Sequence, residues 1–283
     1  MKRLLLLVAL AAMTLAADSR YHEDFHYSFP QGAGGRLSVD NFNGSVEITG
    51  WDQNSVDISG TKYADSESRL RDIRIDASHS GNAVTVRTIH PEFDHHGNMG
   101  AKYVIRVPRQ TELDHVRSSN GGLRVDTVDG NVTIETSNGS VHIGDIHGNV
   151  DAHTSNGSLD IRRVDGRMTF HTSNGSVRAE NIRGGVHATT SNGSVDLEFD
   201  SAQTQANDVV ASTSNGGITV RLPALTNATV SAHTSGHDRI YSDFDVTVHG
   251  SLAKYRLEGN IGNGGGPRID LSTSNGNIKL LKS

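Results

Sequence analysis

The sequence predicts an all-β chain that folds as one parallel β-solenoid, with 18-residue rungs in its central part. Ser-Asn-Gly recurs every 18 residues, at positions 119–121, 137–139, 155–157, 173–175 and 191–193. A period this short, carrying valines and isoleucines at alternate positions, is typical of a chain that coils and stacks each repeat on its neighbour. The 31 glycines and only 5 prolines among 283 residues also fit short strands joined by many tight turns.

The first 17 residues predict an export signal. Lys2 and Arg3 precede an apolar run from Leu4 to Leu15, and small residues follow it. The run is shorter than the roughly 20 residues that a membrane-spanning helix needs. We therefore expect residues 1–17 to be cleaved, leaving a mature chain without a membrane span that is periplasmic, on the cell surface or secreted.

Three regions are expected after the signal. Residues 18–115 are irregular strands that start the solenoid, with an early rung around Asn-Gly-Ser-Val-Glu-Ile at 43–48 and a short helix within 64–72. Residues 116–200 are the regular repeats. Residues 201–283 form irregular rungs and closing strands, with Ser-Asn-Gly again at 214–216 and 274–276. Irregular ends are expected because an open rung would otherwise present unpaired strand edges.

Each repeat has room for two strands and two turns. Because side chains alternate along a strand, Val141 and Ile143 share one face of the first strand, and Val150, Ala152 and Thr154 share one face of the second. Stacking at the 18-residue period forms two core columns: Val141, Leu159, Val177 and Val195, and Val132, Val150, Met168 and Val186.

The turns carry glycine in every repeat. Both turns are expected to use left-handed backbone, which glycine and Asn-Gly adopt most readily. The asparagines of the Ser-Asn-Gly turn should stack at one corner, each amide bonding to the next: Asn120, Asn138, Asn156, Asn174 and Asn192. A calcium-binding roll is not expected, because Asp151 is succeeded by Thr169 and His187 one and two repeats later.

Composition excludes several classes of function. Cysteine is absent, so disulfides, thiolate metal sites, a cysteine nucleophile and lipid attachment through cysteine are excluded. Removing Lys2 and Arg3 leaves 24 basic against 32 acidic residues, a net charge of −8. A nucleic-acid partner would require a basic face and is not expected.

Several short motifs along the chain resemble the bacterial putative-adhesin family of β-strand-repeat domains, a domain of unknown function found in exported proteins. They are Asn-Gly-Ser-Val-Glu-Ile-Thr-Gly-Trp-Asp at 43–52, Val-Ile-Arg-Val-Pro at 104–108, Val-Arg-Leu-Pro at 220–223, and Gly-Asn-Gly-Gly-Gly at 262–266 followed by the segment 269–280. The resemblance implies a stacked-strand fold and an extracytoplasmic setting. It brings no catalytic residues with it.

Histidines are the candidate metal ligands. His153 and His171 occupy the same position in successive repeats and could share a metal with Glu135 and Asp151, or could be solvated residues of a duplicated outer face. The loop around His90, His95 and His96 is a second candidate; the alternative is a polar excursion. No metal or other cofactor is assigned to the chain.

Other chemistry has less support in the sequence. One outer column mixes His142, Asp160, Arg178 and Asp196, and another holds Asp145, Arg163 and Asn181; alternating charge along a column has a structural explanation. No pair of acids is singled out as a glycosidase would require. Trp51 could stack on a sugar ring or pack against a turn.

The function predicted from these observations is a non-catalytic cell-envelope or secreted protein, an adhesin-like scaffold rather than an enzyme. Its partners would be an envelope glycan or a surface protein, since long parallel walls offer many equally spaced contacts. Two alternatives stay open. One is a polysaccharide lyase or hydrolase working on a groove of the solenoid, and the other is a structural protein that assembles with itself through its end rungs.

Overall fold

A computed structural model of the chain describes residues 21–90, 98–200, 207–235, 238–248 and 254–283. The predicted export signal and two of the candidate histidines, His95 and His96, lie outside these ranges. Within them, no helix is long and apolar enough to cross a membrane.

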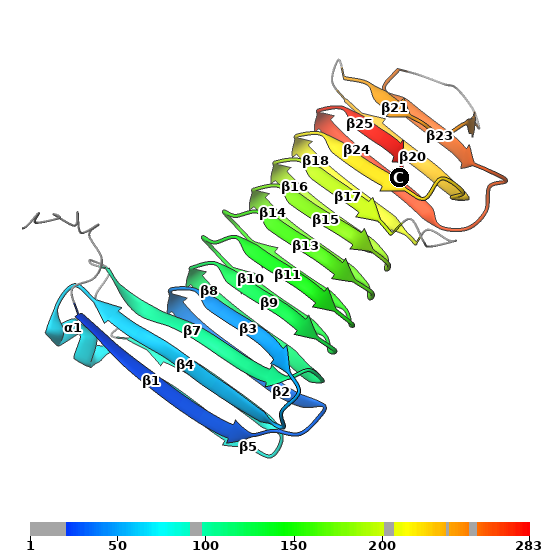
Figure 1. Ribbon diagram of the computed structural model, residues 1–283. Coiled ribbons are helices and arrows are strands. Elements are labelled where there is room, and N and C mark those ends of the chain that lie inside the picture. Colours follow the sequence, from blue (N-terminus) through cyan, green and yellow to red (C-terminus); the bar gives the residue numbers. More distant parts are fainter. Residues whose placement is uncertain (1–20, 91–97, 201–206, 236–237, 249–253) are drawn as a thin grey trace, which may run out of the picture.

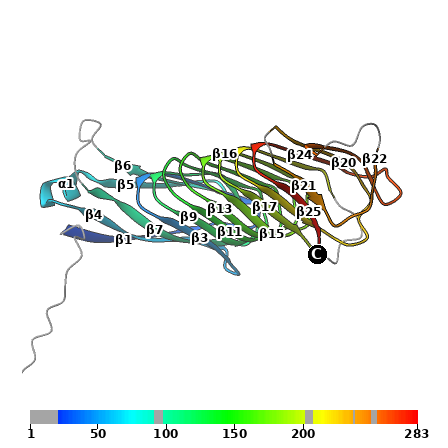
Figure 2. The ribbon, with the colours of Figure 1, turned by 90° about the horizontal axis from the view of Figure 1, so that it is seen from above.

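Two long sheets pack face to face along the solenoid (Figures 1 and 2). The 12-stranded sheet, which lies in front in Figure 1, is called the front sheet, and the 13-stranded sheet is called the back sheet. The front sheet has the spatial order β1 (Tyr21–Pro30), β4 (Ser55–Ala64), β7 (Met99–Pro108), β3 (Val46–Trp51), β9 (Leu123–Val128), β11 (Val141–Ile146), β13 (Leu159–Val164), β15 (Val177–Ile182), β17 (Val195–Phe199), β19 (Ile218–Leu222), β25 (Ile278–Lys282) and β21 (Ile240–Ser242).

The back sheet has the spatial order β22 (Val246–Val248), β23 (Arg256–Ile261), β20 (Ala228–Thr234), β24 (Arg268–Asn275), β18 (Val209–Asn215), β16 (Val186–Asn192), β14 (Met168–Asn174), β12 (Val150–Thr154), β10 (Val132–Thr136), β8 (Thr111–Asn120), β2 (Gly35–Asn43), β6 (Ala83–Ile89) and β5 (Arg74–Ser80). The short helix α1 (Glu67–Asp72) falls inside the predicted segment 64–72, and its N-cap Ser66 accepts a hydrogen bond from the backbone N–H of Arg69.

In the central part, each 18-residue rung contributes one strand to each sheet, and neighbouring rungs pair in parallel. The register is the predicted one: Val141 pairs with Leu159, and Leu159 pairs with Val177. In the back sheet Val150 pairs with Met168. The all-β parallel solenoid is therefore confirmed.

The core lies between the two sheets and follows from the alternation of apolar and polar residues. The inward residues of both sheets join one continuous hydrophobic cluster. The front sheet contributes branched aliphatic side chains such as Leu159 and Ile161, which are fully buried. The back sheet contributes smaller residues such as Ala152 together with the larger Phe170 on the next strand, so that sizes compensate along the stack.

The two ends of the solenoid switch to antiparallel strands. At the N-terminal end β1 pairs antiparallel with β4, and β4 with β7. Phe25, Tyr27 and Phe29 of β1 pack against the core, and the Tyr27 hydroxyl donates to the carbonyl of Ile75 on β5 of the other sheet. At the C-terminal end β23 pairs antiparallel with both β20 and β22. These strands cover the core where a parallel rung would leave it open.

The turn glycines do not supply the left-handed backbone that the sequence predicts for the central rungs. Left-handed φ values occur instead at four residues that are not glycine, one rung apart: Thr127 (62°), Asp145 (50°), Arg163 (51°) and Asn181 (55°). The glycines are needed for close approach. A Cβ on Gly157 would lie 1.9 Å from the carbonyl oxygen of Gly139 in the preceding rung, and the other turn repeats this crowding.

Candidate functional site

The Ser-Asn-Gly corner is a ladder of side-chain amides. Asn138 Nδ2 donates to Asn120 Oδ1 at 2.8 Å, and the same bond repeats at every following rung. The further bonds join Asn156 to Asn138, Asn174 to Asn156, Asn192 to Asn174, Asn215 to Asn192 and Asn275 to Asn215, at 2.8–3.0 Å. The ladder thus holds every asparagine predicted for it and continues into the C-terminal rungs.

A second ladder lies inside the same corner. Thr154 Oγ1 donates to the carbonyl of Gly139 at 3.1 Å, and Thr172 Oγ1 donates to the carbonyl of Gly157 at 3.0 Å. The threonines are buried, and each one binds the corner glycine of the preceding rung. Sequence reasoning placed Thr154 inward but missed this bond. The corner residues satisfy one another, so their repetition has a structural explanation.

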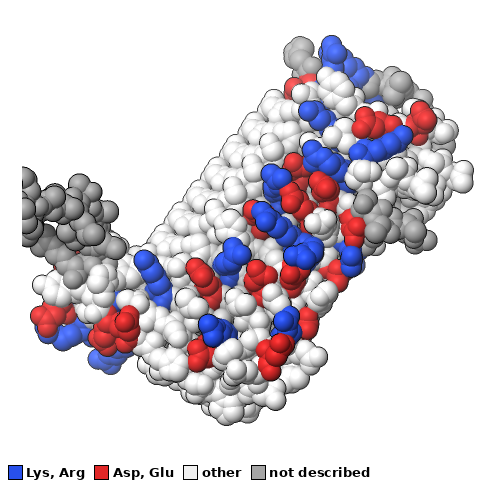
Figure 3. All heavy atoms as spheres, in the orientation of Figure 1, with Lys and Arg blue, Asp and Glu red and all other residues white. Residues whose placement is uncertain are grey.

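The outer face of the front sheet differs from the corner because its residues change from rung to rung. Two columns of outward side chains run along it, aligned by the strand register. Column 1 holds Glu47, Arg124, His142, Asp160, Arg178, Asp196, Thr219 and Lys279, and column 2 holds Thr49, Asp126, Gly144, Arg162, Glu180, Glu198, Arg221 and Leu281. Figure 3 shows the resulting mixture of positive and negative groups on this face, beside an uncharged corner.

Ion pairs cross between the two columns. Arg178 Nε donates to Glu180 Oε1 at 2.7 Å, and Arg221 Nη1 donates to Asp196 Oδ1 at 2.6 Å. The hydrogen bond to Glu180 raises the pKa of the Arg178 guanidinium. All of these groups are partly exposed, so the pairs contribute little to stability.

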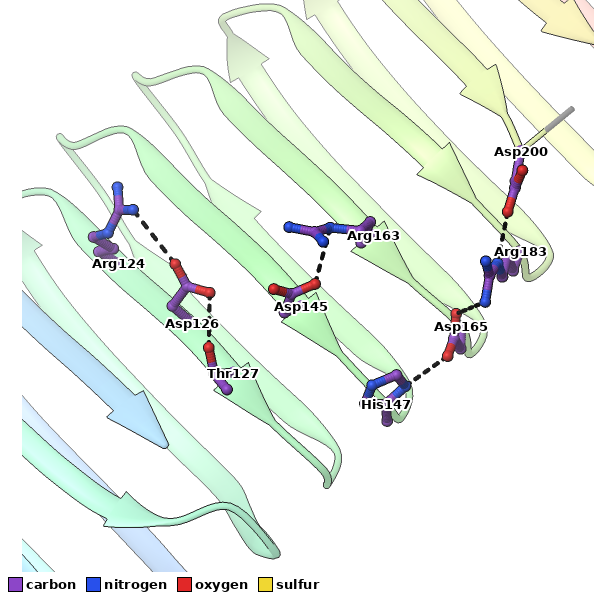
Figure 4. Close-up of polar contacts among 9 residues, drawn as sticks. All are labelled: Arg124, Asp126, Thr127, Asp145, His147, Arg163, Asp165, Arg183 and Asp200. Carbon is purple, nitrogen blue, oxygen red and sulfur yellow. Dashed lines mark hydrogen bonds and ion pairs between the residues drawn. The ribbon is translucent and has the colours of Figure 1, made fainter. Parts of the chain in front are cut away.

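The left-handed residues form a third column beside column 2. Asp145 lies on β11 where the pairing with β13 skips one residue, between Gly144 and Ile146. Arg163 Nε forms an ion pair with its carboxylate at 2.9 Å, as Figure 4 shows. The left-handed φ turns an extra side chain toward solvent in each rung, which widens the charged face.

The turn that joins the front sheet to the back sheet continues this charged surface. His147 Nδ1 lies 2.6 Å from Asp165 Oδ2, Asp165 lies 3.7 Å from Arg183, and Arg183 Nε donates to Asp200 at 2.8 Å (Figure 4). The hydrogen bond to Asp200 raises the pKa of Arg183. Opposite charges alternate from Asp165 through Arg183 to Asp200, which relieves repulsion between neighbouring rungs.

A hollow of about 410 Å³ opens in the face at Gly144. Gly144 has no side chain between Asp126 and Arg162, its column neighbours. Polar and charged residues around it line the walls: Arg124, Asp126, His142, Asp145, Asp160, Arg162 and Arg163. The cross-column pairs are loose here. Arg124 lies 3.4 Å from Asp126, and Arg162 lies 3.7 Å from Asp160.

The candidate metal ligands are placed as follows. The rings of His153 and His171 lie on adjacent strands with centroids 5.8 Å apart and planes tilted by 41°. His153 Nε2 lies 2.7 Å from Asp151 Oδ1, and Glu135 is in register with His153. His90 packs its ring against Phe42 at 4.0 Å. Among the residues that the structure describes, no three or more His, Asp or Glu side chains converge in a way that could hold a metal ion.

Trp51 belongs to a turn near the first rung. Its indole Nε1–H donates to the carbonyl of Ser55 at 2.8 Å, and the Arg106 guanidinium lies 5.7 Å from the ring centre. The hydrogen bond holds the indole against its own turn, which is the packing role weighed in the sequence beside sugar stacking.

Comparison with known proteins identifies the fold. No curated protein matches the chain. A solved structure from Bacteroides fragilis, described as a putative adhesin, is 12% identical over 92% of this chain and 97% of its own, with a TM-score of 0.50. Two structures from Parabacteroides distasonis also match. One, described as a putative adhesin, is 12% identical over 92% of this chain and 97% of its own, with a TM-score of 0.40.

The other, described as a putative lipid binding protein, is 13% identical over 93% of this chain and 98% of its own, with a TM-score of 0.38. At these identities the likeness concerns the fold alone. The family model described as Toastrack DUF4097 matches residues 35–281, which includes both ladders and the whole charged face. The chain therefore belongs to the Toastrack DUF4097 family.

Proposed function

We propose that this protein is an exported, non-catalytic binding scaffold of the cell envelope, adhesin-like in its role, and that the outer face of its front sheet binds an extended envelope glycan. One observation carries the proposal. The face presents arginines and carboxylates in columns, at the strand spacing of about 4.8 Å, over successive rungs whose backbone scarcely changes.

Such a face suits a polymer with regularly spaced polar groups. An extended chain lying along the columns can make one weak contact at each rung, and many weak contacts add up to useful affinity. Arginine forks bind carboxylate or sulfate groups in pairs of hydrogen bonds, while aspartate and glutamate accept hydrogen bonds from hydroxyl groups. A glycan offers both kinds of group on every unit.

Binding is favoured over hydrolysis by the way the acids are used. A glycosidase needs two carboxyl groups that face one glycosidic bond. On this face Asp145, Glu180 and Asp196 instead each accept a close contact from an arginine of a neighbouring column or rung. The export setting is supported by the predicted signal in residues 1–17, and the adhesin-like role by the description of the Bacteroides fragilis structure that shares this fold.

Capture from envelope material tests the proposal. Purified protein carrying a C-terminal tag is incubated with the solubilised envelope of its own source, and bound glycan and protein are both identified and titrated to saturation. Arg178→Gln removes a front-face charge. Arg268→Gln is the matched control. Arg268 forms the same kind of ion pair with an acid two residues later, Asp270, but this pair lies on the outer face of the back sheet.

We expect saturable capture of a glycan, weakened several-fold by Arg178→Gln and unchanged by Arg268→Gln. Equal weakening by both variants would contradict the assignment to the front face. Capture of a protein without any glycan would show that the partner is a protein and not a glycan. New reducing ends or ultraviolet-absorbing unsaturated products in the incubated glycan would show that the protein is a hydrolase or lyase and not a non-catalytic scaffold.

A further inference from the structure

The hollow at Gly144 differs from the rest of the charged face because a glycine stands where the other central rungs carry a charged side chain. Elsewhere in column 2 the central rungs carry a charged side chain, from Asp126 through Arg162 to Glu198. The glycine leaves space of about 410 Å³, inside the range of roughly 300–1,000 Å³ that small-molecule sites occupy. The backbone does not need glycine here, because Gly144 has no left-handed φ and the atoms nearest to an added Cβ would all belong to the Asp126 side chain.

Two of the arginines beside the hollow are held only loosely by their carboxylate neighbours and can turn to a ligand. Arg124 and Arg162 contact their carboxylate neighbours at 3.4 and 3.7 Å, whereas the arginines farther along the face hold theirs at 2.6–2.7 Å. Their side chains are 58% and 67% exposed. Since they stand on the rungs before and after Gly144, their guanidinium groups can approach one anionic group from two sides.

The carboxylates around the hollow have unused capacity to accept hydrogen bonds. Asp126 leans over the glycine, so that a Cβ at Gly144 would lie 3.2 Å from Asp126 Oδ1. Asp160 Oδ1 is buried and accepts no hydrogen bond from any residue that the structure describes. Buried acceptors are normally paired, and rotation of the Asp160 carboxylate about its Cβ–Cγ bond would bring this oxygen to a hydroxyl of a bound molecule.

We propose that the Gly144 hollow is a subsite for one uronate unit of an acidic glycan, with the sugar carboxylate between Arg124 and Arg162 and the sugar hydroxyls donating to Asp126 and Asp160. The assignment rests on the proposed function and specifies the chemistry of the unit. A neutral sugar would leave the two arginines with only their distant carboxylate neighbours, and a simple anion would leave Asp160 Oδ1 without a donor.

Titration calorimetry with trigalacturonic acid tests the subsite, with its methyl ester as the uncharged probe. Gly144→Val fills the hollow, and a β-branched residue suits the strand. Gly122→Val is the matched control: it adds the same side chain outside the hollow, where a Cβ meets only Ser140 at an ordinary 3.5 Å. Arg162→Gln removes one of the two cations.

We expect saturable binding of the acid, at least tenfold weaker binding of the ester, a tenfold or greater loss with Gly144→Val and with Arg162→Gln, and no change with Gly122→Val. Unchanged affinity in Gly144→Val, equal binding of acid and ester, or no binding of the acid to the native protein would each overturn the subsite. If the Gly144→Val variant melts at the native temperature, its loss of affinity is a local effect at the hollow and not a consequence of unfolding.

The subsite and the proposed function can fail separately. If trigalacturonic acid does not bind but Arg178→Gln still weakens capture of an envelope glycan, the subsite is wrong and the front-face scaffold stands. If no glycan is captured by the native protein, the proposed function is wrong, and trigalacturonic acid binding at the hollow would then be judged on the Gly144→Val result alone.

Discussion

Gly157 and Gly144 are both glycines of the central rungs, yet they belong to two parts of the molecule with different tasks. Gly157 stands in the Ser-Asn-Gly corner, where a Cβ would lie 1.9 Å from the carbonyl oxygen of Gly139. Gly144 stands on the outer face of the front sheet, where a Cβ would meet the Asp126 carboxylate at 3.2 Å. The corner repeats because stacking demands it, and the face varies because stacking leaves it free.

Residues that recur in every rung and residues that change from rung to rung use their hydrogen bonds differently. The residues that recur every 18 positions, such as Thr154 and Asn156, donate hydrogen bonds to the neighbouring rung. The residues that change, such as Arg124, His142 and Asp160 in one column, keep part of their capacity for solvent or a partner. In a solenoid of this kind, departure from the period is the better guide to function.

Leu159→Asp should have the largest effect on the fold. Leu159 is fully buried between Val141 and Val177, so the substitution places an unpaired charge in the core and should lower the free energy of unfolding by about 4 kcal/mol. Asp160→Asn, one residue on and facing outward, should change it by less than about 0.5 kcal/mol. Urea denaturation checks both, and an unchanged midpoint for Leu159→Asp would refute the assignment of faces.

Gly157→Ala should be the next most damaging change and sharpens the comparison of the two glycines. Its methyl group would collide with backbone rather than with a flexible side chain, so the rungs must separate locally. We expect a loss of about 3 kcal/mol in unfolding free energy, measured by urea denaturation. Gly144→Ala should be neutral or slightly stabilising, since it reduces the freedom of the unfolded chain. Equal losses in the two variants would erase the distinction between corner and face.

Thr172→Val should have a smaller but measurable effect. The substitution keeps the shape of the buried side chain and removes the hydrogen bond to the Gly157 carbonyl, leaving that oxygen without its side-chain donor. The expected loss is about 1–2 kcal/mol. Thr169→Val, in the same strand but facing outward, is the control and should be near neutral. If both variants melt alike, the inner ladder does not contribute to stability.

The repeat made much of the fold predictable. Alternating apolar residues and a fixed period determine which side chains face inward and which residues are neighbours, so columns such as Val132, Val150 and Met168 follow from counting. The asparagine ladder follows for the same reason. These features depend on local pattern and on translation by one rung, and both are written in the sequence.

Other features depend on distances between atoms of different rungs or segments and could not be derived by counting residues along the repeat. The turn glycines were expected to adopt left-handed backbone, whereas the structure assigns that conformation to residues such as Asp145 and Arg163 and uses the glycines for close approach. The antiparallel ends depend on pairing between segments far apart in sequence, such as β1 and β4. The alignment of Gly144 with Asp126 and Arg162 follows from the period, but the size of the hollow depends on how the side chains around it point.

We propose that the Ser-Asn-Gly corner stabilises the fold, while the outer face of the front sheet binds the partner. The most direct test measures capture of envelope glycan and the melting temperature on one sample of the double variant Arg178→Gln/Arg221→Gln, whose substitutions lie on the front face outside the hollow, beside the native protein. We expect a native melting temperature and at least tenfold weaker capture. Undiminished capture at a native melting temperature, or weaker capture only in a sample that has lost its melting transition, would contradict it.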